Sequence, residues 1–386
     1  MIQRFIRTLF LLTLMSPIML IQAEPSNLQP LVATAPQLPV RAYLLMDADT
    51  GDILASKAAD HSVEPASLTK LMSLYVISNA LHHGLVHLDD PVWVSRHAWQ
   101  EEGSRMFIRA GEKIPLKTLI QGVIVASGND ATMALAEHIA GSETGFVSLM
   151  NQAATQLKLH QTHFTNPTGM PNQKHHSSAR DLAYIARQLI QNFPEHYHWY
   201  QQKWFRYNKI RQPNRNRLLW LDPSVDGLKT GHTSSAGYCL VASAKREHMR
   251  LIAVVLGAES DTARNTAAQQ LLNYGFRFFE TVPLLDKAQH ITTLPVRKGS
   301  KTQALIGPSK NVKVTIPRGS KAQIKLEPYH PHTLTAPFQT GHAVGSLWVK
   351  LNDTILTKTP LVALSSVSTG SRLHNFIDTL KAWADD

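Results

Sequence analysis

The sequence predicts an α+β domain followed by a small all-β domain and a C-terminal amphipathic helix. Strand-like runs lie at both ends of residues 24–282 and helical periodicity lies between them, so one sheet would join the two ends of this domain. From residue 283 onward, short alternating apolar and polar runs are separated by Gly and Pro, which is typical of a β domain. Residues 372–386 place their apolar side chains on one helical stripe.

Residues 1–23 are expected to be a signal peptide. Arg4 and Arg7 precede an apolar run from Leu9 to Ile21, and the small residue Ala23 follows. The run is short for a membrane-spanning helix, and no stop-transfer pattern follows it. The alternative is an uncleaved anchor. We therefore expect an exported protein.

The formal net charge of the chain is +11, and loss of the two arginines in residues 1–23 leaves +9. Such a balance favours anionic surfaces: lipid head groups, anionic wall polymers or nucleic acid. We expect no nucleic-acid partner, because no nucleic-acid-binding module is recognisable in the sequence and aromatic residues do not interleave with basic clusters. The only cysteine, Cys239, excludes an intramolecular disulfide and is expected to be a buried small hydrophobe.

The elements of the first domain follow in chain order. After a Pro-containing leader at 25–39, residues 41–57 predict two strands joined by an Asp/Thr/Gly turn. Helical spacing is found at 67–76, 116–127, 129–141, 146–160 and 179–193, with a turn-rich loop at 164–171. Residues 236–258 predict a β-hairpin, and 265–281 predict a helix that packs on its sheet.

The second domain is expected to span 283–364, and a linker at 365–371 would join it to the tail. The apolar stripe of the tail consists of Leu373, Phe376, Ile377, Leu380 and Trp383. Such a stripe is typical of a helix that lies on a membrane surface, but this polar face is more acidic than anionic lipid prefers. Its charged residues are Asp378, Asp385 and Asp386 against Arg372 and Lys381. The alternative is a helix packed on the β domain.

Ser67 and Lys70 lie one turn apart at the start of an apolar helix. Pro65 suits a first helical turn, and residues three apart share a helix face, so the amine can reach the hydroxyl. The positive end of the helix dipole disfavours a protonated lysine, and a lysine whose pKa is lowered can act as a base toward serine. Such a pair is also compatible with a solvated helix start, although Ser67 is the only serine followed by lysine three residues later.

The sequence Ser127-Gly128-Asn129 ends one predicted helix and opens the next. Gly128 would permit a sharp turn that directs the Ser127 hydroxyl and the Asn129 amide into a cleft. Ser, Asn and Asp are also common helix N-caps, so this stretch alone is ambiguous.

Lys229, Thr230 and Gly231 precede an apolar strand. A cation and a hydroxyl at a strand edge can hold a substrate carboxylate, and Gly231 would let a substrate backbone come close. The alternative for this stretch alone is an ordinary surface turn.

The three motifs S-x-x-K, S-G-N and K-T-G occur once each and in this order, and together they resemble the penicillin-recognising serine acyltransferases. The contexts PASLTK, ASGNDA, DGLKTGHT, NPTGMP, GYCLVASAKR and NYGFRFFET are similar to those of the low-molecular-mass penicillin-binding proteins, specifically the D-alanyl-D-alanine carboxypeptidases. The resemblance is strong over residues 25–282. For the β domain and the tail it is limited to their order along the chain. It implies a β-lactamase/transpeptidase-like first domain with no cofactor.

The resemblance implies that Ser67 attacks the carbonyl between the two terminal D-alanines of a peptidoglycan stem peptide. Lys70 would take the serine proton, and Ser127 would relay a proton to the leaving amine. Asn129 would hold the substrate amide and Lys70. β-Lactam antibiotics would acylate Ser67 as inhibitors.

The resemblance also assigns the substrate-binding groups. Lys229 and Thr230 of the K-T-G motif would bind the terminal carboxylate, and Arg264 would lie near it. The backbone N–H groups of Ser67 and His232 would form the oxyanion hole. The implied location is the periplasm, with the tail attached peripherally to the outer face of the inner membrane.

There are three alternatives to a carboxypeptidase. A class A β-lactamase uses a glutamate followed four residues later by asparagine, and none of Glu137, Glu143 and Glu195 has this partner, so slow deacylation is expected. A D,D-endopeptidase or transpeptidase uses the same three motifs. A non-enzymatic wall-binding protein with a vestigial domain would have lost part of the site, whereas all three motifs are intact.

The histidines His175, His176, His196 and His198 form the one group that suggests a metal site. Their spacing fits no usual set of metal ligands, and histidines in surface loops are the commoner case. We therefore predict no metal.

Overall fold

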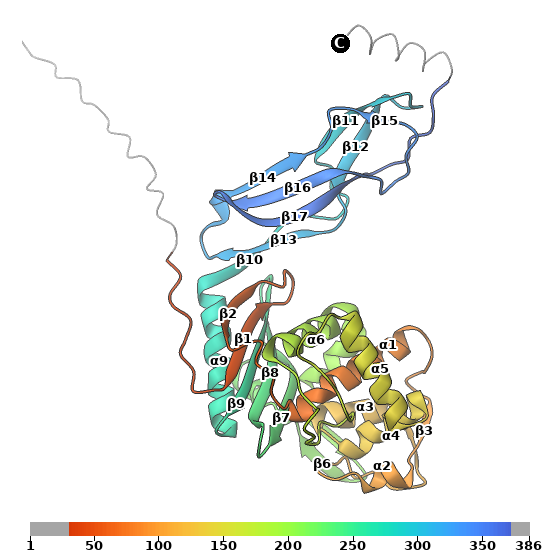
Figure 1. The fold of residues 1–386 in the computed structure, drawn as a ribbon, viewed down its shortest axis with the longest axis vertical. Coiled ribbons are helices and arrows are strands. Elements are labelled where there is room, and N and C mark those ends of the chain that lie inside the picture. The colour runs from red at the N-terminus through yellow and green to blue at the C-terminus, as the bar shows by residue number, and fades with distance from the viewer. Residues whose placement is uncertain (1–30, 372–386) are drawn as a thin grey trace, which may run out of the picture.

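The computed structural model describes residues 31–371. The expected signal peptide (1–23) and tail helix (372–386) lie outside the described residues. Figure 1 shows two parts, an α+β first domain and an all-β second domain that stands on one end of it. This confirms the predicted fold class for the two domains. Among the described residues, no helix has the length and apolar character needed to cross a membrane.

The first domain is built on one five-stranded sheet with the order β2-β1-β9-β8-β7. Every neighbouring pair is antiparallel, and strands from both ends of the domain lie side by side, as predicted. β7 forms an edge, because only β8 pairs with it in this sheet. The strands are β1 (Ala42–Asp47), β2 (Ile53–Lys57), β7 (Val225–Thr233), β8 (Gly237–Arg246) and β9 (Met249–Ala258).

Helices cover both faces of this sheet (Figure 1). α9 (Asp261–Phe278) packs on one face, where its buried Leu271 and Leu272 join a core with the side chains of β8 and β9. The opposite face carries the larger core and the remaining long helices. These are α1 (Lys70–His82), α3 (Leu116–Val125), α4 (Asn129–Ala140), α5 (Glu143–Gln156) and α6 (Ala179–Asn192).

Short elements connect the long ones. Ser67 of the S-x-x-K motif lies in the 3₁₀ turn η1 (Ala66–Thr69), directly before α1. The others are β3 (Pro91–Trp93), α2 (Arg96–Gln100), β4 (Lys113–Pro115), α7 (Pro194–Tyr197), η2 (His198–Gln201), β5 (Trp204–Tyr207), β6 (Ile210–Pro213) and α8 (Leu218–Leu221).

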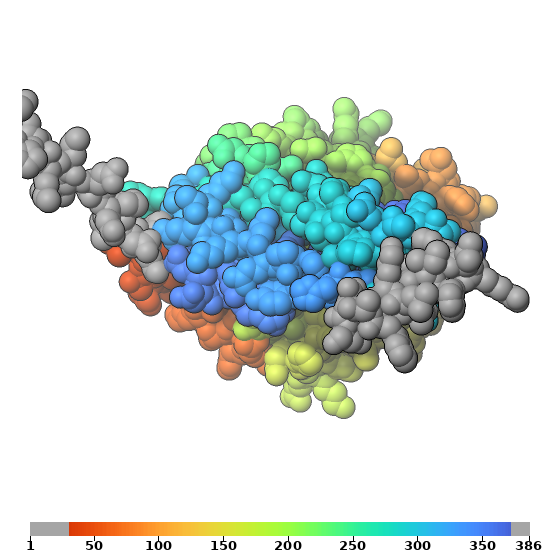
Figure 2. Space-filling view, turned by 90° about the horizontal axis from the view of Figure 1, so that it is seen from above, coloured from red at the N-terminus to blue at the C-terminus, as the bar shows by residue number. Residues whose placement is uncertain are grey.

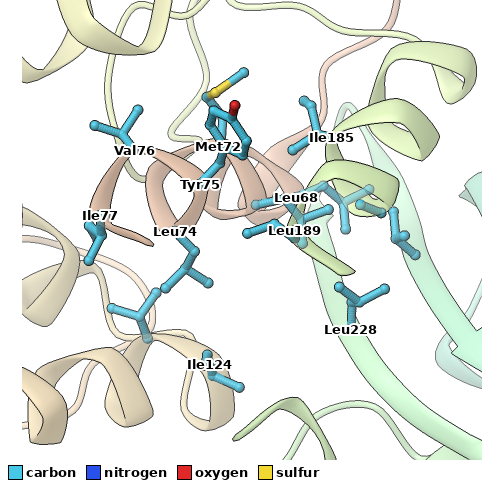
Figure 3. Packing of buried hydrophobic residues seen from close by; sticks show 14 of the residues in the cluster. Leu68, Met72, Leu74, Tyr75, Val76, Ile77, Ile124, Ile185, Leu189 and Leu228 are labelled. Carbon is cyan, nitrogen blue, oxygen red and sulfur yellow. The ribbon is translucent and has the colours of Figure 1, made fainter. Parts of the chain in front are cut away.

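α1 is buried on nearly all sides, which explains why its sequence is apolar without a polar stripe. Figure 3 shows its side chains among those of α3, α6 and β7. Burying each large side chain stabilises the fold by about 1.5–3 kcal/mol. The helix is thereby held as the rigid centre of the domain. The residues that meet here include Leu68, Met72, Leu74, Ile77, Ile124, Ile185, Leu189 and Leu228.

The second domain contains a six-stranded sheet, β14-β16-β17-β12-β11-β15, and a separate pair, β10–β13. Its buried Val, Leu and Ile side chains form a core of their own. The elements are β10 (Phe279–Leu285), β11 (Thr292–Arg297), β12 (Gln303–Pro308), β13 (Val312–Pro317), η3 (Lys321–Gln323), β14 (Ile324–Tyr329), β15 (Leu334–Thr335), β16 (Ala343–Leu351) and β17 (Thr354–Ala363).

Two boundaries of the second domain differ from those predicted. β10 begins at Phe279 and pairs with β13, so this sheet pair starts four residues before the expected 283. The stretch 365–371 is not a free linker along its whole length. Val367 is 1% exposed and exchanges backbone hydrogen bonds with Phe338, because an apolar side chain in this Ser-rich run packs into the core.

The two domains contact each other through the turn between β1 and β2. Thr281 Oγ1 donates to the buried carboxylate of Asp47, and the hydroxyls of Thr50 and Thr315 are 2.7 Å apart. Lys313 lies 3.2 Å from Asp49 in an ion pair. Figure 2, seen from above, shows the second domain lying over one end of the first.

Candidate active site

The three motifs meet at one cleft of about 620 Å³ beside the edge strand β7. Six predicted site residues line it directly, namely Ser67, Ser127, Thr230, Gly231, His232 and Arg264. Lys70, Asn129 and Lys229 lie in the wall beneath, each at most 3% exposed. The cleft is thus lined by hydroxyls and backed by buried amines.

Ser67 lies close to the N-terminus of α1, as predicted, but within the turn η1 and not within α1 itself. The backbone of β7 presses against this turn. A Cβ atom on Gly231 would come within 2.9 Å of Pro65 O and 3.2 Å of Ser67 N. We expected Gly231 to make room for a substrate backbone, and in the structure the missing side chain makes room for the turn that carries Ser67.

Lys70 is held by three oxygen atoms. Its Nζ donates to Ser67 Oγ at 3.0 Å, to Asn129 Oδ1 at 2.7 Å and to the carbonyl of Thr168 at 2.6 Å. A neutral amine has only two hydrogens, and the amide and carbonyl oxygens can only accept. In the neutral state the lone pair of Lys70 is therefore left for the Ser67 hydroxyl, which is the arrangement that a base needs.

Burial, and to a smaller extent the positive charge of Arg215, lower the pKa of Lys70 to about 7. A large fraction of the amine is then neutral near neutral pH. A lowered pKa is the direction predicted from the helix dipole, but burial is the largest cause.

The S-G-N turn has a different conformation from the one predicted. Ser127 has φ +60°, in the left-handed region, whereas Gly128 has an ordinary φ of −59°. Gly128 is needed for space, because a Cβ there would lie 2.8 Å from Asp130 Oδ1 and 3.0 Å from Met106 N. The carboxylate of Asp130 accepts from the N–H groups of Met106 and Phe107, both at 2.8 Å, and so fixes the turn.

Lys229 joins the K-T-G and S-G-N motifs. Its Nζ donates to Ser127 Oγ at 2.8 Å and to the carbonyl of Thr230 at 3.0 Å. Burial and the nearby Lys70 hold the pKa of Lys229 well below its usual range. Because its amine is turned to Ser127 and is absent from the cleft lining, Lys229 can act on a ligand through that hydroxyl.

Asn129 uses both ends of its amide within the protein. Its Oδ1 accepts from Lys70, and its Nδ2 donates to the carbonyl of Glu102 at 2.6 Å. The expected contact with Lys70 is therefore present. We also expected Asn129 to bind a substrate amide. Its Nδ2 has no hydrogen left for this, since its second contact is to Met170 Sδ at 3.6 Å.

Three arginines line the cleft, namely Arg215, Arg217 and Arg264. Arg264 is only 5% exposed, and its guanidinium donates to Asp261 and to the carbonyl of Gly231 at 3.4 Å. Arg215 is exposed in the cleft lining and was not predicted. Arg217 was not predicted either, and nothing in the local sequence distinguishes Arg215 or Arg217 from other surface arginines, because both come to the cleft only through the fold.

The loop at 164–171 was predicted as a turn, without a role in the site. It brings the Thr168 carbonyl to Lys70, and the Asn166 side chain accepts from the N–H groups of Thr168, Gly169 and Met170. The Asn-Pro-Thr-Gly run was the only signal, and it indicates a turn without indicating what the turn touches.

His175 is not in a surface loop, which corrects the prediction for this residue. It is 2% exposed and bonded within the protein. Burial lowers its pKa to about 4. Across residues 31–371, no group of three or more His, Cys, Asp or Glu side chains is placed to hold a metal ion. Cys239 is buried, as predicted.

An α+β domain with a serine turn at the edge of its sheet, a buried lysine hydrogen-bonded to that serine and a second hydrogen-bonded serine–lysine pair is typical of a serine-type acyl-transfer enzyme. Comparison with known families agrees with this class. Residues 29–260 match the D-alanyl-D-alanine carboxypeptidase family, and residues 279–369 match the C-terminal domain of penicillin-binding protein 5. The chain belongs to the D-alanyl-D-alanine carboxypeptidase family of serine peptidases, which confirms the resemblance seen in the sequence.

Individual relatives cover nearly the whole chain. It is 42% identical to D-alanyl-D-alanine carboxypeptidase DacC of Escherichia coli, over 89% of this chain and 88% of that protein. The structure of penicillin-binding protein 5 from Haemophilus influenzae aligns with a TM-score of 0.82 and 40% identity, covering 87% of this chain and 99% of the other. A Streptomyces DD-transpeptidase aligns with a TM-score of 0.60 and 30% identity, covering 64% of this chain and all of its own.

Proposed function

We propose that the protein removes the terminal D-alanine from peptidoglycan stem pentapeptides through an acyl-enzyme on Ser67. The observation that carries the proposal is the hydrogen bonding of Lys70, whose two acceptor-only partners leave its lone pair for the Ser67 hydroxyl. The family and the relatives named as carboxypeptidases support the substrate class.

In this mechanism Lys70 takes the Ser67 proton as the oxygen attacks the carbonyl between the two D-alanines. The backbone N–H groups of Ser67 and His232 receive the developing negative charge. Ser127, polarised by Lys229, gives a proton to the leaving amine. Water then releases the shortened peptide.

In this proposal the terminal carboxylate lies against Thr230, and Arg215 and Arg264 also line the cleft. A hydroxyl and two guanidinium groups are a suitable set for a carboxylate. A β-lactam carries a carboxylate and a reactive amide carbonyl, so it acylates Ser67 in the same place, and slow release makes it an inhibitor.

The test is an intact-mass measurement after incubation with benzylpenicillin. Wild-type protein should gain one stable covalent adduct, and Ser67→Ala should gain none. Rapid penicillin turnover without an adduct would identify a β-lactamase instead, and absence of labelling would indicate a non-catalytic wall-binding protein. Release of D-alanine from a synthetic pentapeptide then establishes the carboxypeptidase step.

A second candidate, transfer to an amine acceptor, is favoured by the similarity to the Streptomyces DD-transpeptidase. Both reactions pass through the same acyl-enzyme and differ in whether water or an amine attacks it. Mass analysis after incubation with pentapeptide, with an added amino-acid acceptor and with cross-linked dimers, separates hydrolysis, transpeptidation and endopeptidase action.

We further propose that the mature protein is periplasmic and held at the outer face of the inner membrane by residues 372–386. The signal-peptide layout of 1–23 and the apolar stripe of the tail support this. The charge of residues 283–371, with 11 Lys and Arg against three Asp and Glu, also suits an anionic surface. Deletion of 372–386 should move the protein from the membrane fraction to the soluble fraction, and an unchanged distribution would contradict the proposal.

A further inference from the structure

The imidazole of His175 joins two segments of the active site that are far apart in sequence. Its Nε2 lies 2.8 Å from the hydroxyl of Thr69, a residue between Ser67 and Lys70. Its Nδ1 lies 3.1 Å from the backbone N and 3.2 Å from the hydroxyl of Thr165, in the loop 164–171. The ring therefore bridges the serine turn and the loop.

The hydrogen bonds require one tautomer of this ring. The backbone N–H of Thr165 can only donate, so Nδ1 must accept and the hydrogen of the neutral ring lies on Nε2. Nε2–H then donates to the Thr69 hydroxyl. Burial, together with the facing groups His163, His176 and Lys70, lowers the pKa of His175 to about 4, so the ring stays neutral when the protein is at neutral pH.

The loop on the other side of this bridge sets the hydrogen bonding of Lys70. It supplies the Thr168 carbonyl at 2.6 Å from Nζ, and it lies directly against the backbone of the serine turn. A Cβ on Gly169 would come within 1.9 Å of Ala66 O. A shift of the loop relative to the turn would therefore move the Thr168 carbonyl away from the amine.

We infer that His175 is a positioning residue for Lys70, acting through Thr69 and the loop 164–171. Without the bridge, the Thr168 carbonyl no longer occupies one hydrogen of the neutral amine. That hydrogen is then free to turn toward Ser67 Oγ, and the lone pair of Lys70 is no longer directed at the serine proton. The inference rests on the roles proposed above for Ser67 and Lys70.

Thr69→Val tests the bridge with little change in volume, because valine keeps the shape of threonine and lacks the hydroxyl. We expect the rate constant of acylation by benzylpenicillin to fall by about tenfold or more, as small misplacements of a catalytic base do. The dissociation constant of the non-covalent complex should stay within about twofold, because the bridge does not touch the cleft. Thr69→Ser restores the hydroxyl and should restore the rate.

His175→Asn removes the Nε2 donor from the other end of the bridge and should show the same split between acylation and binding. The double variant with Thr69→Val should be no slower than the slower single variant, since both break one bridge. His176→Asn is the matched control, because that side chain bonds only the Lys174 carbonyl and should leave acylation unchanged.

The outcomes separate the two proposals. If wild-type protein gains no adduct at Ser67, the proposed function is wrong and this inference falls with it. If wild type is acylated and Thr69→Val matches its rate, His175 does not position Lys70. Weaker binding with an unchanged acylation step, or failure of Thr69→Ser to restore the rate, would equally overturn the inference.

Discussion

At the scale of single residues, the protonation state of Lys70 governs the proposed reaction. Its folded-state pKa is lowered to about 7 by burial, so the amine loses its reactive neutral form as pH falls below that value. We expect the second-order rate constant for acylation by benzylpenicillin to drop about tenfold for each pH unit below 7 and to level off above it. A profile that stays flat between pH 5.5 and 9 would show that another group is the base.

The same shift has a consequence for stability. The pKa of Lys70 is lower in the folded protein than the value of 10.5 for a free lysine side chain, so the unfolded chain binds the proton more tightly between these two pH values. The free energy of unfolding should therefore gain a contribution from Lys70 as pH rises from about 7 to 10. Lys70→Met should weaken this rise in chemical denaturation curves measured across that range.

Ser127 and Lys229 make a second residue-scale prediction. Lys229 Nζ donates to Ser127 Oγ, and this hydroxyl is the proposed proton donor to the leaving amine. Ser127→Ala removes that donor. The turnover number on pentapeptide should fall by about 100-fold or more, as expected for loss of a general acid. Thermal unfolding should check that the variant is folded, and an unimpaired turnover number would assign the proton transfer to another group.

At the scale of elements, two glycines let the backbone pack around the serine turn, and Gly169 can be tested cleanly. Gly169 and Gly111 have nearly equal φ values of +85° and +87°, but only Gly169 has a backbone atom in the way of a Cβ. Gly111→Ala should cost about 1 kcal/mol of backbone strain and leave acylation unchanged. Gly169→Ala should lower the melting temperature further and also slow acylation. Equal effects of the two variants would show that the close contact is unimportant.

Much of the element-scale structure could be predicted from local pattern. The hairpin of β8 and β9 and the long helices follow from period-two and helical spacing, which depend on neighbours in sequence. The features that were missed depend on distant contacts. The start of β10 is set by its partner β13, the burial of Val367 by Phe338, and the left-handed turn at Ser127 by packing of Gly128 on Met106.

The same distinction holds for the site. Ser67 and Lys70 could be paired from sequence because they are three residues apart. Asn129 and Lys229 were placed in the site by resemblance to a family. Thr168, His175 and Arg215 could not be identified, since each reaches the site from an ordinary loop and carries no local signal of its role.

At the scale of the whole molecule, the candidate active site lies within the first domain. No residue lining the described cleft comes from 279–371, and the second domain has a separate core. A Streptomyces relative is fully covered by an alignment to only 64% of this chain. We expect a truncated protein ending at residue 278 to be acylated by benzylpenicillin at a rate within about twofold of the full chain, because the site's contacts are intact.

The truncated protein should nevertheless melt at a lower temperature. It loses the hydrogen bond from Thr281 and leaves the buried carboxylate of Asp47 with fewer partners, which costs about 1–3 kcal/mol. Differential scanning calorimetry of both proteins measures this. A truncated protein that is stable but not acylated would show that the second domain shapes the cleft.

The close packing of main chain against main chain around Ser67 has a further consequence, for how this enzyme tolerates sequence change. Gly231 and Gly169 approach the serine turn with backbone atoms alone. Substitution of most surrounding side chains should therefore leave the position of Ser67 unchanged. A saturation library selected for activity should accept varied residues around the rim of the cleft and only glycine at these two positions. Variants that escape β-lactams while keeping activity should therefore arise on the rim, where shape can change without displacing the serine.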